Sequence, residues 1–284
     1  LAAERSLRRE EALACAHGAV DADGRDEWWV HGARVSAWVR ADGAISDLLW
    51  LDRGVDVLDV LTRYREAYHV DAVARAAERD GAAAAECAAG SASSHEIEEA
   101  AVLERLPPED AETRVLLRER VLPASLAVEA YAEDGPRGEA LEGGLATDGP
   151  RAGAGPRGRS VTWTFVVGSG PRVTRALTIH EDGAVEAAWS WSPDDFAPDS
   201  LFAPELSVGA PVAVTAAEEA GAEVVVELDP PVEIWRYPIV TTSKCPDGFE
   251  EIEQGTSITP RWPASEGRAR LLLRPATGPI PASG

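Results

Sequence analysis

The sequence predicts a mainly β protein, a large antiparallel β-sandwich with a short N-terminal helix and a few helical excursions. Three observations support this fold class. Many short segments alternate apolar and polar residues, and turn signals rich in Gly and Asp separate them. Hydrophobic residues make up 45% of the 284 residues, which is enough for a substantial core.

The first residues have a different period from the rest. Residues 3–16 fit a helix better than an alternating strand, and Asp23-Gly24 then breaks the chain. The chain has no Met and begins at Leu1, which we interpret as the mark of a piece of a longer polypeptide. We therefore expect a helical segment of a preceding region at 1–18, a sandwich domain at 19–274 and a frayed tail at 275–284.

An alternating period of two begins at Glu27. A short strand is expected at 28–31, and two longer strands at 34–40 and 44–52 flank the hairpin signal Asp42-Gly43. Later strands are expected at 161–167, 172–180, 184–191, 205–214, 222–229, 232–237, 256–260 and 268–274.

The middle of the chain is less regular. Residues 56–69 read as a short helix or an irregular segment, and the Ala-rich residues 71–90 as a helix or a surface excursion. Residues 113–132 carry interrupted alternation, which indicates one or two strands. Residues 133–159 are rich in Gly, Pro and Arg, so a long flexible loop is expected there.

Composition excludes several classes of partner. The net charge of −22 disfavours nucleic acid and anionic membranes, because phosphate binding needs clustered cations. No apolar run approaches the roughly 18 residues of a membrane-spanning helix. Cys15, Cys87 and Cys245 lack the close pairing of a zinc site or a disulfide framework. We expect a cytoplasmic protein without cofactor or metal.

Two constellations have side chains suited to chemistry. The first, Leu61 to His69, includes Arg65, Glu66, Tyr68 and His69. Its Arg and Glu suit sugar hydroxyls, Tyr suits a pyranose face and His suits proton transfer. The alternative, which we favour, is an ordered, salt-bridged corner that docks on a neighbouring domain.

The second constellation is the aromatic tract near the C-terminus. Trp235 and Trp262 suit stacking on a sugar, with Arg236, Glu250 and Gln254 as partners for hydroxyl groups. The alternative is that both Trp side chains fill the core and that Arg236 pairs with Glu250. The adjacent carboxylates Asp194-Asp195 and Glu218-Glu219 are better explained as solvated turns than as an acid/base pair.

The order of several tracts resembles the C-terminal region of the glycoside hydrolase family 57 α-amylases and 4-α-glucanotransferases. That family has a Leu-Thr-Arg-Arg-x-Glu-x-Tyr-His tract, a Ser-Ile-His-Glu-like tract, a Trp-x-Phe-Pro-Ile-x-Thr tract, and then Gly-Phe-Glu, Gln-Gly and Pro-x-Trp-Pro. The corresponding residues here are 61–69, Ser94-His95-Glu96, 235–241, 248–250, Gln254-Gly255 and 260–263.

Two departures from the family pattern bear on binding. An Asp-His pair of the family is replaced by Glu119-Arg120, and a Ser-Glu before Gly-Phe-Glu by Cys245-Pro246-Asp247. If those positions bind substrate or seat the catalytic domain, that role is weakened in this chain.

The resemblance implies a galactose-mutarotase-like supersandwich and an N-terminal catalytic barrel in the same polypeptide, outside these residues. It therefore transfers no catalytic residue. The expected function is a non-catalytic C-terminal domain of an α-glucan-acting enzyme, which supports the barrel and contacts glucan. Two alternatives stay open: a stand-alone carbohydrate-binding module, and a mutarotase- or epimerase-like enzyme that uses His69 or His95. The candidate binding or interdomain residues are those of the two constellations together with His95.

Overall fold

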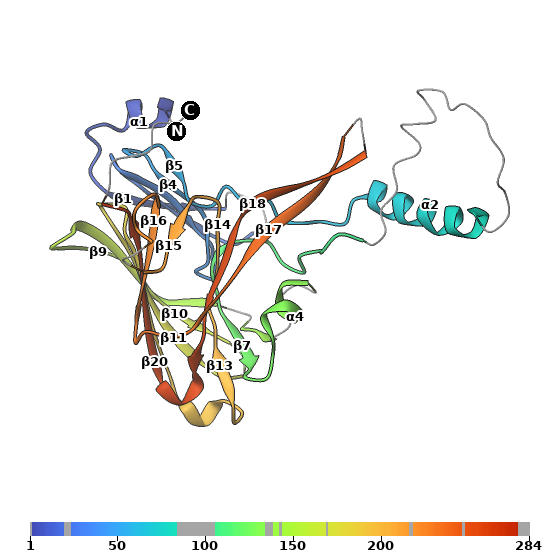
Figure 1. Cartoon of the computed structure of the whole chain (residues 1–284). Helices are drawn as coiled ribbons and strands as arrows, with labels where there is room; N and C mark the ends of the chain where they lie inside the picture. Colours follow the sequence, from blue (N-terminus) through green and yellow to red (C-terminus); the bar gives the residue numbers. More distant parts are fainter. Residues whose placement is uncertain are drawn as a thin grey trace.

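A computed structural model describes residues 2–19, 24–83, 106–133, 139–141, 144–168, 170–215, 218–245 and 248–277. Within these ranges the chain is mainly β, and its strands pair antiparallel except for β15 and β16, which pair parallel. The expected mainly β, antiparallel sandwich is confirmed, with two large sheets facing each other and a smaller sheet at one end (Figure 1).

The first sheet has the order β1-β2-β3-β4-β6-β14-β18-β17, and β5 pairs with β4 at its side. It combines the N-terminal meander with the last long hairpin of the chain. Its strands are β1 (Ala14–Gly18), β2 (Glu27–His31), β3 (Val35–Val39), β4 (Ile45–Trp50), β5 (Val55–Asp56), β6 (Leu116–Arg118), β14 (Glu205–Val208), β17 (Ile234–Cys245) and β18 (Gly248–Pro260).

The second sheet has the order β15-β16-β20-β12-β11-β10-β9. Its strands are β9 (Leu145–Gly155), β10 (Gly158–Val167), β11 (Val173–His180), β12 (Val185–Trp191), β15 (Val212–Ala213), β16 (Val224–Asp229) and β20 (Arg268–Pro275). The small sheet has the order β19-β13-β7-β8, formed by β7 (Arg120–Pro123), β8 (Glu139–Ala140), β13 (Ser200–Phe202) and β19 (Trp262–Pro263). The helices are α1 (Ala2–Leu7), α2 (Ala67–Ala83), α4 (Val128–Glu133) and the 3-10 turns η1 (Pro193–Asp195) and η2 (Ala264–Glu266).

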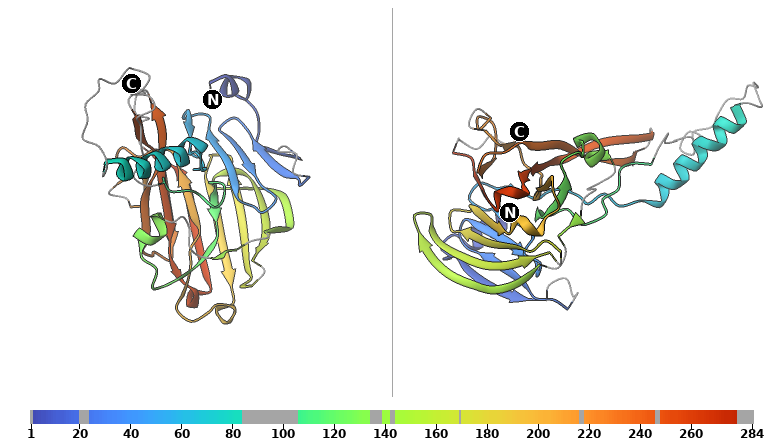
Figure 2. Two further views of the ribbon diagram at one scale, coloured as in Figure 1. Left: turned by 90° about the vertical axis from the view of Figure 1, so that its right-hand side faces the viewer. Right: turned by 90° about the horizontal axis from the view of Figure 1, so that it is seen from below.

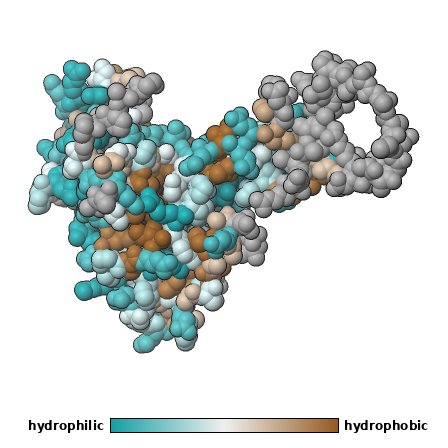
Figure 3. Space-filling view, in the orientation of Figure 1, coloured by the Kyte–Doolittle hydropathy of each residue, from teal (hydrophilic) through white to brown (hydrophobic). Residues whose placement is uncertain are grey.

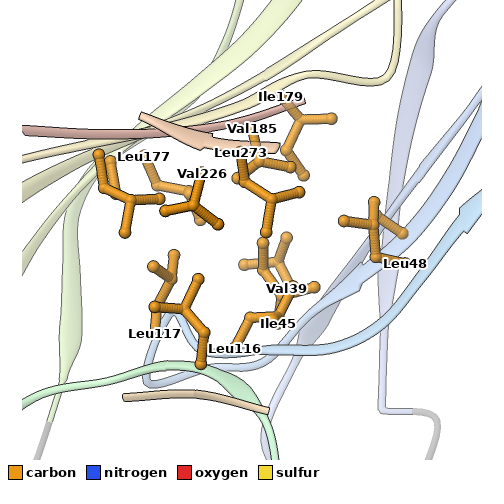
Figure 4. Packing of buried hydrophobic residues seen from close by; sticks show 14 of the residues in the cluster. Val39, Ile45, Leu48, Leu116, Leu117, Leu177, Ile179, Val185, Val226 and Leu273 are labelled. Carbon is orange, nitrogen blue, oxygen red and sulfur yellow. The ribbon is translucent and has the colours of Figure 1, made fainter. Parts of the chain in front are cut away.

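The core lies between the two large sheets. Alternation places one side chain in two on the inner face, so β11 and β12 show buried positions at every second residue. Figure 4 shows inner side chains of the first sheet opposite those of the second, for example Ile45 and Leu116 facing Val226 and Leu273. Each fully buried Leu or Ile of this kind stabilises the fold by about 1.5–3 kcal/mol.

The predicted Asp42-Gly43 hairpin is present between β3 and β4. Gly43 has a φ of +79°, a region that favours glycine, and the Asp42 carboxylate accepts a hydrogen bond from the Ala44 N–H at 3.0 Å. A Cβ at Gly43 would lie 2.0 Å from the Arg175 guanidinium, so the turn also makes room for a buried arginine.

Two expectations about the N-terminus and the middle of the chain are wrong. The helix expected at 3–16 ends at Leu7, and residues 14–18 instead form β1 on the edge of β2. The flexible loop expected at 133–159 contains β9, which pairs with β10 from Gly155 to Leu145. Nearly all of β9 is exposed, so backbone pairing orders it, and hydrophobic pattern could not have signalled it.

The chain is ordered at the start of the expected tail. Ala276 is buried, and its N–H donates to the Glu223 carbonyl at 2.9 Å, so the ordered chain continues past residue 275. Of the two interpretations of the Ala-rich stretch, a helix or the favoured surface excursion, a helix is present as far as Ala83. The cap expected at Ser93 to Glu96 lies outside the described residues.

One part of the molecule projects from the sandwich. Helix α2 and the distal halves of β17 and β18 extend to one side of the two sheets, and Figures 1 and 2 show this in three directions. We call α2, residues 61–66 before it, and the paired residues 240–245 of β17 and 248–253 of β18 the arm. No helix in the described ranges is long and apolar enough to span a membrane.

Candidate functional site

The arm joins the two constellations that the sequence singled out. Tyr68, at the start of α2, stacks on Phe249 of β18 with ring centroids 6.2 Å apart and planes 20° apart. The Tyr68 hydroxyl donates to the Thr242 carbonyl of β17 at 3.4 Å. Segments 174 residues apart in sequence therefore meet at the base of α2.

His69 is a structural residue at this junction. Its ring is 5% exposed, and Nε2 lies 2.9 Å from the Thr242 carbonyl oxygen while Nδ1 lies 3.3 Å from the Glu66 N–H. An N–H donates to a carbonyl and a backbone N–H needs an acceptor, so the proton is assigned to Nε2. With both ring nitrogens bonded to backbone, His69 is poorly placed to transfer a proton to a substrate.

A buried ionic network lies next to the arm. The Arg63 guanidinium donates to Asp110 Oδ1 at 2.8 Å, and Arg114 donates to the same oxygen at 2.6 Å. Arg114 also donates to Glu205 Oε1 at 2.9 Å, and Arg120 donates to Glu205 Oε2 at 3.2 Å. All five side chains are buried, so this chain of charges ties residue 63 to the strands of the first sheet.

Glu205 accepts hydrogen bonds from three further side chains. They are the hydroxyls of Tyr131, Tyr237 and Ser257, at 3.0, 3.0 and 2.8 Å. Burial on its own would raise the pKa of Glu205, but Arg114 and Arg120 outweigh it and hold the pKa below its ordinary value. Glu205 is thus ionised at neutral pH, whereas a glycosidase acid needs a raised pKa.

Asp110 follows the same pattern. Burial raises its pKa, and hydrogen bonds from Arg114 and Arg63 lower it by more, so that its pKa lies below the usual value. Both buried carboxylates of the network are therefore acceptors fixed in the ionised state. The arrangement suits a rigid support rather than acid/base catalysis.

The Glu119-Arg120 pair, a departure from the family pattern, belongs to the interior. The two side chains lie in different clusters: Arg120 joins Glu205, and Glu119 pairs with the fully buried Arg175 and accepts from Trp189 Nε1 at 3.0 Å. Arg175 also donates to the Asp42 carbonyl at 2.9 Å, which links the second sheet to the first. In this chain the pair contacts the sandwich itself.

The two tryptophans of the C-terminal tract are core residues. Trp235 is 6% exposed and lies between Tyr131, at 5.3 Å, and the Arg261 guanidinium, at 4.1 Å. Trp262 is fully buried, and its Nε1 donates to the Pro230 carbonyl at 2.9 Å. The alternative that these side chains fill the core therefore fits the structure, and neither ring presents a face to a sugar.

The remaining predicted site residues are spread over the surface. Arg236 pairs with Glu218 at 3.1 Å, so the ion pair expected with Glu250 is wrong. Glu250 is exposed on the arm, and Gln254 donates to Thr241 Oγ1 at 3.1 Å. Arg65 pairs with Glu109 at 2.7 Å, Glu66 is exposed, and His95 lies outside the described residues.

Exposed apolar side chains gather on the arm and beside it. They are Leu61, Tyr64, Val70, Leu106 and Ile252, with exposed fractions of 61, 62, 47, 38 and 39%. Figure 3 shows hydrophobic residues on this side, between the sandwich and the arm. We call these five residues the arm patch. A group of exposed aliphatic side chains on one projection is typical of a protein contact surface.

Sequence reasoning missed the residues that organise this side. Glu205 lies 91 residues from Arg114 in the sequence, although Asp110 and Arg114 are only four residues apart. A usable signal was Glu205 itself, a charged residue at the start of the strand with Leu206 and Val208. A buried carboxylate requires buried partners, although their identity does not follow from the strand.

Comparison with protein families identifies the chain. The model described as "Alpha-amylase/4-alpha-glucanotransferase, C-terminal" matches residues 19–141 and 200–273, well over half of the sequence. The chain belongs to this family. The matched residues of this amylase/glucanotransferase C-terminal domain include the buried ionic network and both sides of the arm. The unmatched residues 142–199 include β9 to β12, most of the second sheet.

Individual relatives agree with the family. A 4-alpha-glucanotransferase of Thermococcus kodakarensis is 27% identical over 278 residues, covering 90% of this chain. The crystal structure of 4-alpha-glucanotransferase from Thermococcus litoralis superposes with a TM-score of 0.61 at 20% identity, over 96% of this chain. The chain spans 39% of the first protein and 42% of the second, so each relative is more than twice as long as the part it shares.

Proposed function

We propose that this chain is the non-catalytic β-sandwich part of an α-glucan-acting enzyme, a 4-α-glucanotransferase or α-amylase of the glycoside hydrolase family 57 type. The observation that carries the proposal is the family match, combined with the fact that the chain spans only 39% and 42% of the two relatives. The buried carboxylates Glu205 and Asp110 support it, because both are held ionised by arginines and neither can act as a general acid.

The arm patch is the surface proposed to seat the catalytic region of the same polypeptide. Its side chains are mostly aliphatic, which suits contact with protein better than contact with a sugar. The ionic network from Arg63 to Glu205 holds the base of the arm against the sandwich, so the patch is presented on a rigid support.

A cytoplasmic location is part of the same proposal. Cys15 and Cys245 are free thiols, and burial raises the pKa of Cys15 to about 11, which keeps it protonated and unreactive. Free thiols of this kind are typical of a reducing compartment.

The proposal is tested by comparing the 284-residue chain with the longer polypeptide that contains it. Incubated with maltooligosaccharides, the chain alone is expected to leave the sugars unchanged, and the longer polypeptide to redistribute or hydrolyse them. Turnover by the purified chain alone would overturn the non-catalytic assignment.

The proposed contact between the arm patch and the catalytic region is tested by introducing charged side chains on the patch. Tyr64→Asp and Ile252→Asp should lower the melting temperature and activity of the longer polypeptide and leave the isolated chain folded. Leu145→Asp is the matched control, since Leu145 is 68% exposed on β9, away from the arm. Equal effects of all three substitutions would remove the arm patch from the proposal.

A further inference from the structure

A pair of tryptophans lies on the outer face of the first sheet, away from the arm. Trp29 of β2 and Trp38 of β3 are directly opposite each other in register, and both are half-buried. Their ring centroids are 5.4 Å apart and their planes differ by 8°, so the two indoles stack nearly parallel. Alternation puts them on the side of the sheet opposite Val30 and Val39, which face the core.

Trp29, one member of this pair, already has several contacts with other side chains of the protein. The Arg8 guanidinium lies 4.5 Å from the centre of the Trp29 ring. The centre of the His31 ring, two residues further along β2, lies 4.4 Å from the same point. The Trp29 N–H donates to Ser36 Oγ at 3.1 Å, and Glu11 holds Arg8 at 2.5 Å. Trp29 is therefore fixed in place and its hydrogen-bonding capacity is used.

The second indole, that of Trp38, has fewer aromatic and cationic neighbours. Among the residues that the structure describes, Trp38 has a ring contact only with Trp29, and its indole N–H has no hydrogen-bond partner. That N–H is not one of the buried polar atoms that lack a partner, so it reaches solvent. A partly exposed aromatic ring with an open donor thus reaches the surface.

Asp47 of β4 is the register neighbour of Trp38 on the same outer face. In the described ranges no arginine, lysine or histidine pairs with its carboxylate. Burial raises the pKa of Asp47 to about 6, and the nearby carboxylates of Asp56 and Glu4 add to the increase. A half-buried acid kept without a cation costs stability, which is typical of a group that serves a ligand.

We propose that Trp38 and Asp47, with Trp29 beside them, form a surface binding site for a pyranose ring of an α-glucan. The carbon-bound hydrogens of the sugar pack on the indole face of Trp38. A ring hydroxyl donates to the Asp47 carboxylate, and a hydroxyl oxygen accepts from the Trp38 N–H.

The combination of donor and acceptor selects the ligand class. Asp47 only accepts hydrogen bonds and the Trp38 N–H only donates, and a hydroxyl group does both. An organic cation such as a guanidinium would pair with Asp47 but cannot accept from the Trp38 N–H, so it would use only one of the two groups. The choice of an α-glucan among sugars rests on the proposed function.

The test is a calorimetric titration of the 284-residue chain with maltoheptaose. We expect saturable binding with a dissociation constant on the order of 1 mM or tighter, and a loss of at least about tenfold in Trp38→Ala. Asp47→Asn should weaken binding by roughly tenfold without loss of folding, because it removes the unpaired charge. Tyr64→Ala, which removes a more exposed ring on the arm, is the control and should bind like the parent.

Three results would overturn the site. They are no saturable binding by the parent chain, unchanged affinity in both Trp38→Ala and Asp47→Asn, and saturable binding of tetramethylammonium or guanidinium in place of maltoheptaose. Failure here is distinct from failure of the proposed function, because a chain that binds no glucan can still seat a catalytic region. Conversely, glucan turnover by the isolated chain would refute the non-catalytic role and leave the binding site standing.

Discussion

Two aromatic regions of the molecule, the C-terminal tract and the strand pair β2 and β3, have roles opposite to those that their residue types suggest. The C-terminal tract carries Trp, Tyr, Arg, Glu and Gln close together, yet Trp235 and Trp262 are buried and fully engaged with Tyr131, Arg261 and the Pro230 carbonyl. The strand pair β2 and β3 shows only short alternating runs, yet it leaves Trp38 beside an unpaired carboxylate. Residue type therefore locates a binding surface less well than polar groups that have no partner within the protein.

The largest expected effect concerns the network behind the C-terminal tract. Glu205→Ala removes the carboxylate shared by the buried Arg114 and Arg120, which keep only Asp110 and Glu112 as partners, and it removes the acceptor of Tyr131 and Tyr237. We therefore expect a loss of about 3–5 kcal/mol in the free energy of unfolding. Urea unfolding followed by circular dichroism measures it. Glu218→Ala, which breaks only the exposed pair with Arg236, should cost less than about 1 kcal/mol.

The two tryptophan environments are compared directly by truncation. Trp262→Ala opens a cavity in the core and should cost about 3–5 kcal/mol. Trp38→Ala removes a partly exposed ring and should cost only about 1–2 kcal/mol. Equal losses in urea unfolding would mean that Trp38 is as much a core residue as Trp262.

Substitution of Asp47 is expected to raise the stability of the folded chain, whereas the substitutions above lower it. The pKa of Asp47 is raised from 3.8 to about 6 in the folded state, so the folded chain binds its proton more tightly than the unfolded chain does. Stability from this group is complete below about pH 4 and is lost as pH rises through about 6. Asp47→Asn should therefore be more stable than the parent at pH 8, by about 1 kcal/mol after allowance for its partial exposure. Melting temperatures from pH 4 to 8 check this, and a variant that is less stable at pH 8 would contradict it.

The smallest expected effect is at the arm patch in the isolated chain. Tyr64→Asp and Ile252→Asp should each change the free energy of unfolding by no more than about 0.5 kcal/mol, because both side chains are exposed. The same substitutions should destabilise the longer polypeptide, and differential scanning calorimetry of both forms compares them. A large loss in the isolated chain would show that the patch packs against its own domain.

Alternation predicted much of the fold. The meander from β2 to β4 and the strands β10, β11 and β12 follow their apolar patterns, because one face of each strand is buried. β1 and β9 did not follow from the sequence, since edge pairing orders exposed residues that have no apolar pattern. The tract from Leu61 to His69 was correctly singled out as an ordered corner, but its bond to Thr242 is a tertiary contact that no local pattern encodes.

The candidate sites were harder to predict than the strands. Glu205 depends on arginines 91 and 85 positions away, and the Trp29–Trp38 stack depends on strand register. The residue types of the C-terminal tract suggested a sugar surface, and burial decided otherwise for its two tryptophans.

The most direct measurement follows the indole N–H signals of the nine tryptophans by NMR during a titration with maltoheptaose. Single substitutions assign the signals of Trp38, Trp235 and Trp262. We expect the Trp38 signal to shift in a saturable manner while those of Trp235 and Trp262 stay in place. Shifts at Trp235 and Trp262 with an unchanged Trp38 signal would contradict it.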